Sequence, residues 1–112
     1  MAEVGFAIEY APPVASFTYS PLAPCTGETV IFNASASYDP DGNIASYKWD
    51  FGDGNITTVS HPVIAHTYVA VGTYMVNLTV IDNDGLTGTT IEYIVTNNLV
   101  RSVDDSIGDV EA

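Results

Sequence analysis

Residues 47–54 read Tyr-Lys-Trp-Asp-Phe-Gly-Asp-Gly, and this stretch decides the fold. Its aromatic residues, Tyr47, Trp49 and Phe51, stand at every second position, so on a pleated strand they share one face. The charged residues between them point to water. Because each ring buries a large apolar area, three rings on one face can begin a core between two sheets. The pattern therefore predicts a strand with a buried aromatic face.

The strand ends at the sequence Gly52-Asp53-Gly54. The two glycines accept positive φ, and the side chain of Asp53 can bond its own backbone. This combination predicts a tight hairpin turn directly after the aromatic strand.

Six other segments carry strand patterns, and turn residues separate them at intervals of about ten residues. We expect these strands over residues 15–19, 29–35, 57–60, 63–68, 73–80 and 89–96. The fold class that follows is all-β: an antiparallel two-sheet β-sandwich of immunoglobulin type with about seven strands.

Alternation also assigns the buried face of each strand. The residues expected to face inward in the second strand are Val30, Phe32 and Ala34. In the strand with the cleanest alternation they are Tyr74, Val76, Leu78 and Val80. In the last strand they are Ile91, Tyr93 and Val95.

Length and charge bound the possible functions. A chain of 112 residues suits one domain and needs no disulfide to fold, so we expect the single Cys25 to be a buried or half-buried thiol. Fourteen acidic residues against Lys48 and Arg101 give a formal net charge of −12. Binding to phosphates needs Lys or Arg, so nucleic acid and anionic membrane surfaces are excluded as partners. The charge favours cations instead.

Three N-x-S/T sequons, at Asn33, Asn55 and Asn77, are glycosylation candidates, and all three fall where we expect exposed positions. No run approaches the ~20 apolar residues of a membrane span. The first residues do not form a signal peptide. Three sequons in a short chain favour an exported protein. We therefore expect an extracellular or cell-surface location, with a targeting segment and other domains outside this stretch.

The tripeptide Ile-Glu-Tyr occurs at residues 8–10 and again at residues 91–93, an offset of 83 (91 − 8). Tandem sandwich domains would give a period of this size. We expect residues 1–10 to be a linker or the tail of a preceding domain, residues 11–97 to be the domain, and residues 98–112 to be an acidic linker or tail. A short amphipathic helix is the alternative for the tail.

Four motifs, read together, resemble a PKD (polycystic kidney disease) domain. They are Asp39-Pro40-Asp41-Gly42, the Trp-Asp-Phe-Gly-Asp-Gly of residues 49–54, His66-Thr67-Tyr68, and the run of residues 72–82. The resemblance covers about residues 11–97. It implies a β-sandwich of cell-surface and secreted proteins, often in tandem copies, with a spacer or interaction role and no catalysis. The acidic character and the sequons are similar to those of PKD copies in archaeal surface proteins.

Two acidic loops are the best candidate site. In a sandwich of this topology, the loop after the second strand and the loop before the last strand lie at the same pole. Their carboxylates are those of Asp39, Asp41, Asp82 and Asp84. Such loops offer the oxygen ligands that Ca²⁺ takes, with water in the remaining positions. The alternative is a pair of ordinary acidic turns.

The resemblance adds to the calcium expectation, because some PKD domains, notably those of bacterial collagenases, bind calcium at this pole. The residues that match best are Asp39, Asp41 and one of Asp82 or Asp84. The collagenase sites also draw ligands from the start of the first strand. Here residues 11–13 offer only backbone oxygens, which leaves a full set of ligands unaccounted for.

No catalytic residue is expected. His61 and His66 are the candidate bases, and His66 is better explained as a ring satisfied inside or beside the core. Asp50 and Asp53 could imitate the carboxylate pair of a glycosidase. A single small sandwich offers no deep cleft, however, and the chemistry of the turn explains Asp53.

The function we expect is that of a non-catalytic spacer and interaction module. Its partners would be other surface proteins, glycans or neighbouring domains, and the isolated chain would be monomeric. The alternative is a carbohydrate-binding accessory module of a secreted hydrolase. Such a module needs exposed rings, whereas the expected register leaves only Tyr38 and Tyr10 free.

Overall fold

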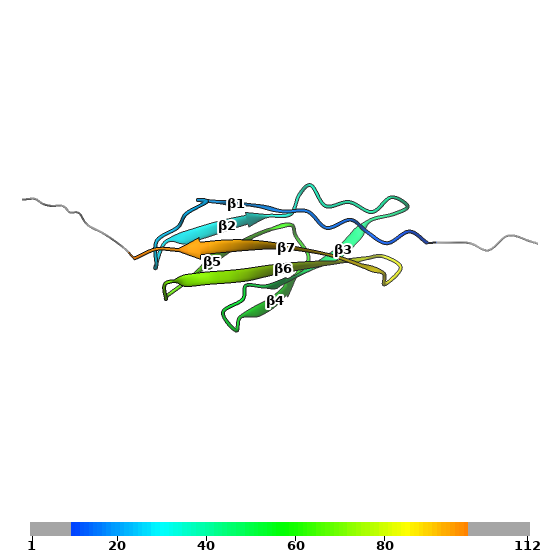
Figure 1. Ribbon diagram of the computed structural model, residues 1–112. Coiled ribbons are helices and arrows are strands. Elements are labelled where there is room, and N and C mark those ends of the chain that lie inside the picture. Colours follow the sequence, from blue (N-terminus) through cyan, green and yellow to red (C-terminus); the bar gives the residue numbers. More distant parts are fainter. Residues whose placement is uncertain (1–9, 99–112) are drawn as a thin grey trace, which may run out of the picture.

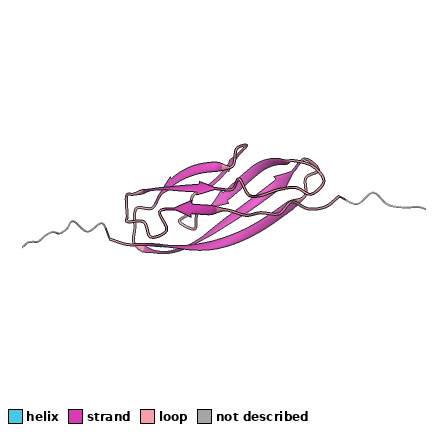
Figure 2. Ribbon diagram, turned by 90° about the horizontal axis from the view of Figure 1, so that it is seen from above, coloured by secondary structure: helices cyan, strands magenta, loops and turns pink. Residues whose placement is uncertain are grey.

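The strands form two sheets, stacked face to face (Figures 1 and 2). The computed structural model describes residues 10–98, so residues 1–9 and 99–112, which hold most of the expected linker and tail, lie outside it. The strands are β1 (Thr18–Ser20), β2 (Thr29–Asn33), β3 (Ile44–Asp50), β4 (Ile56–Val59), β5 (Val63–Thr67), β6 (Gly72–Asp82) and β7 (Thr87–Thr96). Residues 10–98 hold no helix that could cross a membrane.

One sheet has the order β1-β2-β5 and the other the order β4-β3-β6-β7, and neighbouring strands in each are antiparallel. The predicted two-sheet antiparallel sandwich is therefore confirmed. β4, expected as a weak edge strand, lies at one edge of the four-stranded sheet.

The aromatic face of β3 lies at the centre of the core. Trp49 is fully buried, Phe51 is 2% exposed and Tyr47 is 9% exposed, as the alternation predicts. The ring of Trp49 meets the ring of Phe17 edge-on at a centroid distance of 5.2 Å and lies 5.6 Å from that of Phe32. Phe17 precedes β1 and Phe32 belongs to β2, so the aromatic cluster joins the two sheets.

The inward residues of β2 and β6 are also confirmed. Val30, Phe32 and Ala34 are fully buried. So are Leu78 and Val80, and Val76 is 1% exposed. Tyr74 is half-buried, and its ring stacks on that of Tyr68 at 4.3 Å.

The turn between β3 and β4 has the predicted chemistry. Gly52 and Gly54 adopt φ of 84° and 95°, which residues with a Cβ rarely accept. The carboxylate of Asp53 accepts the backbone N–H of Asn55 at 3.1 Å. At Gly52 space matters as well, because a Cβ there would lie 2.6 Å from the carbonyl oxygen of Met75. The turn therefore packs directly on β6.

The predicted register of β7 is wrong. Ile91, Tyr93 and Val95 are 43%, 62% and 50% exposed, whereas Ile94 is fully buried and Thr96 is 1% exposed. Ile94 pairs with Tyr74 of β6, so the even-numbered residues of β7 share the inner face.

Backbone contacts explain why small and polar residues occupy the inner row of β7. The carbonyl of Pro13 passes so close to Gly88 that a side chain there would overlap it. The hydroxyl of Thr96 donates to the carbonyl of Ala70 at 2.8 Å and accepts the N–H of Gly72 at 3.0 Å. Counting apolar side chains cannot reveal either requirement.

The described chain enters and leaves at opposite poles of the sandwich (Figure 1). At the entry pole the N–H of Ala11 donates to the carboxylate of Asp41 at 2.8 Å. At the exit pole the N–H of Asn97 donates to the carbonyl of Pro24 at 3.0 Å, and its own carbonyl accepts the N–H of Thr26 at 2.8 Å. Both ends are thus bonded to the loops around them.

Candidate metal centre

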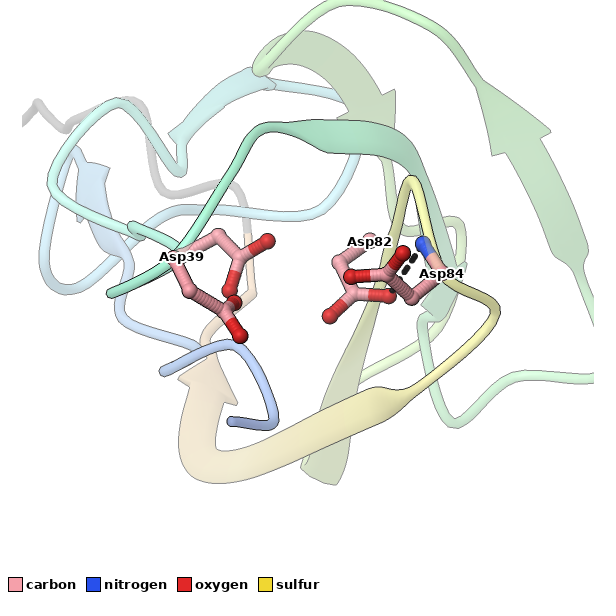
Figure 3. Close-up of side chains that lie close together, drawn as sticks. Asp39, Asp82 and Asp84 are labelled. Atoms are coloured by element: carbon pink, nitrogen blue, oxygen red, sulfur yellow. Dashed lines mark hydrogen bonds between the residues drawn. The ribbon is translucent and has the colours of Figure 1, made fainter. Parts of the chain in front are cut away.

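Four carboxylates converge at the entry pole. Asp39 and Asp41 lie in the loop between β2 and β3, Asp82 ends β6, and Asp84 lies in the turn before β7. One carboxylate oxygen from each lies within 4.8 Å of the others. Figure 3 shows Asp39 facing Asp82 and Asp84 across the gap between the two loops. The predicted meeting of the two acidic loops is therefore confirmed.

Asp82 is the most enclosed of the four, at 2% exposed. Its Oδ1 accepts the backbone N–H groups of Asp84 at 2.9 Å, drawn in Figure 3, and of Leu86 at 2.8 Å. Its Oδ2 is buried and has no hydrogen-bond partner. A buried carboxylate oxygen without a donor is costly, which makes it a natural place for a cation.

Asp39 is in a similar position, because both of its carboxylate oxygens are buried without a hydrogen-bond partner. Partial burial raises the pKa of Asp39 above its ordinary value, with smaller contributions from Asp41 and Asp82. The pKa of Asp84 is also raised, first by burial and then by the charges of Asp82 and Asp41. The raised pKa values of Asp39 and Asp84 mean that no group within residues 10–98 compensates the negative charge of these two carboxylates.

The two loops are held together by a contact that the sequence did not reveal. The side-chain oxygen of Asn83 accepts the N–H of Asn43 at 3.0 Å, and the N–H of Asn83 donates to the carbonyl of Asn43 at 3.0 Å. Gly42 lies beneath this contact, where any side chain would overlap Asn83. The glycine of the Asp-Pro-Asp-Gly turn was the available signal, since it marks a close approach as well as a turn.

The donor set fits Ca²⁺. All four groups are carboxylates, and Ca²⁺ takes six to eight oxygen ligands in flexible geometry. The start of the described chain contacts this pole through Ala11, whose backbone N–H donates to the carboxylate of Asp41. An N–H group is a donor, so this contact supplies no oxygen ligand for a cation. Asp39, Asp41, Asp82 and Asp84 would hold the ion, and water or backbone carbonyls would supply the remaining positions.

His66, considered above as a candidate base, makes structural contacts with Asp53 and Phe51. Its Nε2 lies 2.7 Å from a carboxylate oxygen of Asp53, and its ring stacks on that of Phe51 at 3.9 Å. The interpretation of a satisfied ring beside the core is confirmed. The view that turn chemistry alone explains Asp53 is wrong, because this carboxylate also bonds His66. His61, in contrast, is exposed and contacts the carbonyl of Val63.

The remaining predicted positions vary in exposure. Asn33 and Asn55 are exposed, as expected, but Asn77 is half-buried and its Oδ1 is enclosed without a partner. Asn77 lies on the outer row of β6, between its cross-strand partners Asp50 and Ile91. Cys25 is a half-buried thiol, as expected.

Comparison with known proteins identifies the family and agrees with the β-sandwich fold. A family model described as PKD domain matches residues 10–96. A microbial collagenase from Vibrio alginolyticus is 42% identical over 73 residues, which cover 65% of this chain and 9% of the collagenase. Collagenase ColQ1 from Bacillus cereus is 47% identical over 58 residues, 52% of this chain and 6% of that protein. The chain thus spans less than a tenth of the curated relatives it matches.

Solved structures match over most of the chain. The PKD1 domain of Vibrio anguillarum Epp is 32% identical with a TM-score of 0.69, covering 81% of this chain and 100% of that one. A structure described as the basis for the promiscuous specificity of carbohydrate-binding modules from the β-sandwich superfamily is 46% identical with a TM-score of 0.79. That match covers 81% of this chain and 36% of that one. The chain therefore belongs to the PKD domain family and is a small, non-catalytic accessory module.

Proposed function

We propose that this PKD domain is an extracellular spacer and contact module within a longer multidomain protein, and that it binds Ca²⁺ at its acidic pole. The observation that carries the proposal is the path of the chain, which enters at the pole of Asp41 and leaves at the pole of Asn97. The 11 residues of β6 extend between these poles. At ~3.3 Å per residue this gives a folded length of about 35 Å. Each copy would therefore add a fixed distance between its neighbours.

An extracellular location is supported by the relatives and by the surface. The relatives include microbial collagenases and a pre-pro-metalloprotease, in each of which the matched segment is a small part. The sequons at Asn33 and Asn55 lie on exposed residues, from which a glycan could extend into solvent. We infer that these two positions are the acceptors and that Asn77 is not.

Calcium would act at the junction with the preceding segment. Ala11 bonds to Asp41, so an ion held by Asp41 and Asp82 would connect the entering chain to the end of β6. Ca²⁺ supplies positive charge there, and the protein supplies carboxylates whose mutual repulsion the ion relieves. The consequence is a stiffer entry to the domain. Adhesion to proteins or glycans would then use faces presented at a defined distance.

A tandem fusion of two full chains tests both parts of the proposal. Spin labels are placed at Ser60→Cys in each copy, in a Cys25→Ser background, and the distance between them is measured by double electron–electron resonance. A narrow distribution in Ca²⁺ that broadens with a chelator is expected. A broad distribution in both media would overturn the spacer. A narrow distribution both in Ca²⁺ and with a chelator would overturn the role of calcium. An Asp82→Asn fusion is the matched control, and its distribution should not depend on Ca²⁺.

A carbohydrate-binding accessory role is the second candidate, and one observation favours it. Tyr93 is 62% exposed and lies beside its cross-strand partner Met75, itself 46% exposed, on the outer face of the four-stranded sheet. An exposed ring with an apolar neighbour is a stacking surface for a sugar. Binding to a glycan array that is lost in Tyr93→Ala and kept in Tyr38→Ala would support this role. Absence of binding to any glycan by the parent chain would remove it.

A further inference from the structure

Glu92 lies in a row of β7 that otherwise faces the core. It pairs with Val76 of β6, and residues paired across antiparallel strands share a face. Val76 is 1% exposed, whereas Glu92 is exposed. The difference arises because β7 is the last strand of its sheet. Glu92 therefore stands at the open side of the sandwich, beside the edge strand β1 of the other sheet. The carboxylate of Glu92 therefore borders a space between the edges of the two sheets.

That space is a cavity of about 230 Å³ lined by Phe17, Thr18, Tyr19, Leu22 and Glu92. Its walls are fixed by the core. Phe17 packs edge-on against Trp49, and the hydroxyl of Tyr19 donates to the carbonyl of Tyr93 at 3.1 Å, which ties β1 to β7. Leu22, 74% exposed, forms an apolar rim. The cavity is therefore an aromatic and aliphatic recess with one carboxylate.

Within residues 10–98, no cationic side chain is placed to neutralise Glu92. The one lysine of this part of the chain, Lys48, pairs with Thr58 and Thr79 in an outward-facing row of the sheet, on the other side from the cavity. Among the described residues, the one contact between a basic side chain and a carboxylate joins His66 and Asp53. None of the lining residues belongs to the acidic cluster at the entry pole.

We propose that this cavity receives a lysine or arginine side chain of a partner protein. Both side chains carry a cationic head on an aliphatic stem, and such stems lie along apolar surface while the head stays near water. The stem would lie against Tyr19 and Leu22, with the head at the carboxylate of Glu92 and close to the aromatic faces, which attract cations. A ligand with a carboxylate or phosphate head is disfavoured by Glu92 and by the net charge of −12.

Solution NMR of the ¹⁵N-labelled full chain tests the proposal. The probes are the N-acetyl methylamides of lysine, arginine and norleucine, of which norleucine has a comparable stem and no charge. Lysine and arginine probes are expected to shift the amide signals of Thr18, Leu22 and Glu92, and norleucine to shift them far less. Shifts confined to the loops of Asp39 and Asp84, or equal shifts with all three probes, would overturn the proposal.

Matched variants separate a specific contact from general attraction to an acidic protein. Glu92→Gln is expected to weaken binding of the lysine probe about two- to five-fold, the range of an ion pair open to solvent. Glu28→Gln removes the same charge from an exposed residue outside the cavity and should leave the affinity unchanged. Equal losses in the two variants would contradict the site. Leu22→Ser should weaken the arginine and lysine probes alike, and unchanged binding in it would contradict the proposed path of the stem.

Discussion

The Nε2 atom of His66 lies 2.7 Å from a carboxylate oxygen of Asp53, and this contact ties the two sheets together. His66 belongs to β5 in the three-stranded sheet, and Asp53 lies in the turn that joins two strands of the four-stranded sheet. A second hydrogen bond connects the same two motifs: the hydroxyl of Tyr68 donates to the carbonyl of Phe51 at 2.8 Å. The Trp-Asp-Phe-Gly-Asp-Gly and His-Thr-Tyr motifs therefore act as one structural unit.

Asp53→Asn isolates the contact with His66. The asparagine keeps an oxygen for the N–H of Asn55 but loses the charge that faces the imidazole. Both side chains are less than one-fifth exposed, so we expect a loss of about 1–2 kcal/mol in the free energy of unfolding, measured in urea. Asp50→Asn is the matched control, since Asp50 accepts the N–H of Gly52 in the same way. Equal losses of unfolding free energy in the two variants would contradict a stabilising role for the contact between Asp53 and His66.

The same pair predicts a pH dependence. Partial burial alone would raise the pKa of Asp53, but hydrogen bonds from His66 and Asn55 outweigh it and hold the pKa below its ordinary value. A lowered pKa in the folded state stabilises the protein above the unfolded value, about pH 4, and this stabilisation is lost as the pH falls through the folded pKa. The difference in unfolding free energy between the parent and Asp53→Asn should thus shrink as the pH falls below about 4.

Urea unfolding of both proteins between about pH 3 and pH 7 measures this difference. The pKa values of Asp39 and Asp84 are raised, so these groups favour folding at lower pH, in the opposite direction. They are present in both proteins, and their effect cancels in the comparison. A difference that grows on acidification would show that Asp53 has no lowered pKa.

The turn after β3 predicts unequal effects of two similar substitutions. Gly52 and Gly54 both have positive φ, but a Cβ at Gly54 meets open space whereas one at Gly52 meets the backbone of Met75. Gly54→Ala should cost about 1–2 kcal/mol of stability, the usual strain of a left-handed residue. Gly52→Ala should cost clearly more, because β6 must also move. Thermal unfolding of the two variants, compared with the parent, would contradict this packing if their losses were equal.

Calcium should stabilise the parent chain and not Asp82→Asn. Extracellular calcium modules bind with a Kd of about 10⁻⁴–10⁻³ M, so 10 mM Ca²⁺ (roughly 10–100 times that Kd) should add about 1–3 kcal/mol. For a domain of this size that raises the Tm by several degrees. The asparagine retains an acceptor for the N–H groups of Asp84 and Leu86, so the turn survives. If 10 mM Ca²⁺ did not raise the Tm of the chelator-treated parent, the calcium site would be contradicted. Asp50→Asn is the control, and Ca²⁺ should raise its Tm as it does that of the parent.

Much of the architecture could be predicted because alternation and turn chemistry agreed. In β3 the aromatic residues lie on one face and charged residues on the other, so only one register buries Trp49. The meeting of Asp39 with Asp82 followed from topology, since both loops belong to one pole. What the sequence could not predict is the pair of hydrogen bonds that supports that pole. One joins the backbone of Asn43 to the side chain of Asn83 and the other joins the two backbones, across loops 40 residues apart.

β7 shows where periodicity gives the wrong answer. Its odd-numbered residues are more apolar than its even-numbered ones, so a hydrophobic pattern buries Tyr93. The strand lies at the edge of its sheet, however, where the inner row must leave room for the backbone of Pro13 and supply a hydroxyl to Ala70. These requirements select Gly88 and Thr96 on the inner row, and Ile91, Tyr93 and Val95 are left on the outer face.

The register of β7 can be tested by two alanine substitutions on adjacent residues. Ile94 is fully buried against the core, so Ile94→Ala should lower the free energy of unfolding by about 2–5 kcal/mol, the usual cost of a large buried side chain. Tyr93 is 62% exposed, so Tyr93→Ala should change it by less than about 1 kcal/mol. The measurement is urea unfolding followed by Trp49 fluorescence. The opposite order of the two losses would restore the alternation-based register and would place Glu92 on the outer face, away from the cavity that it lines.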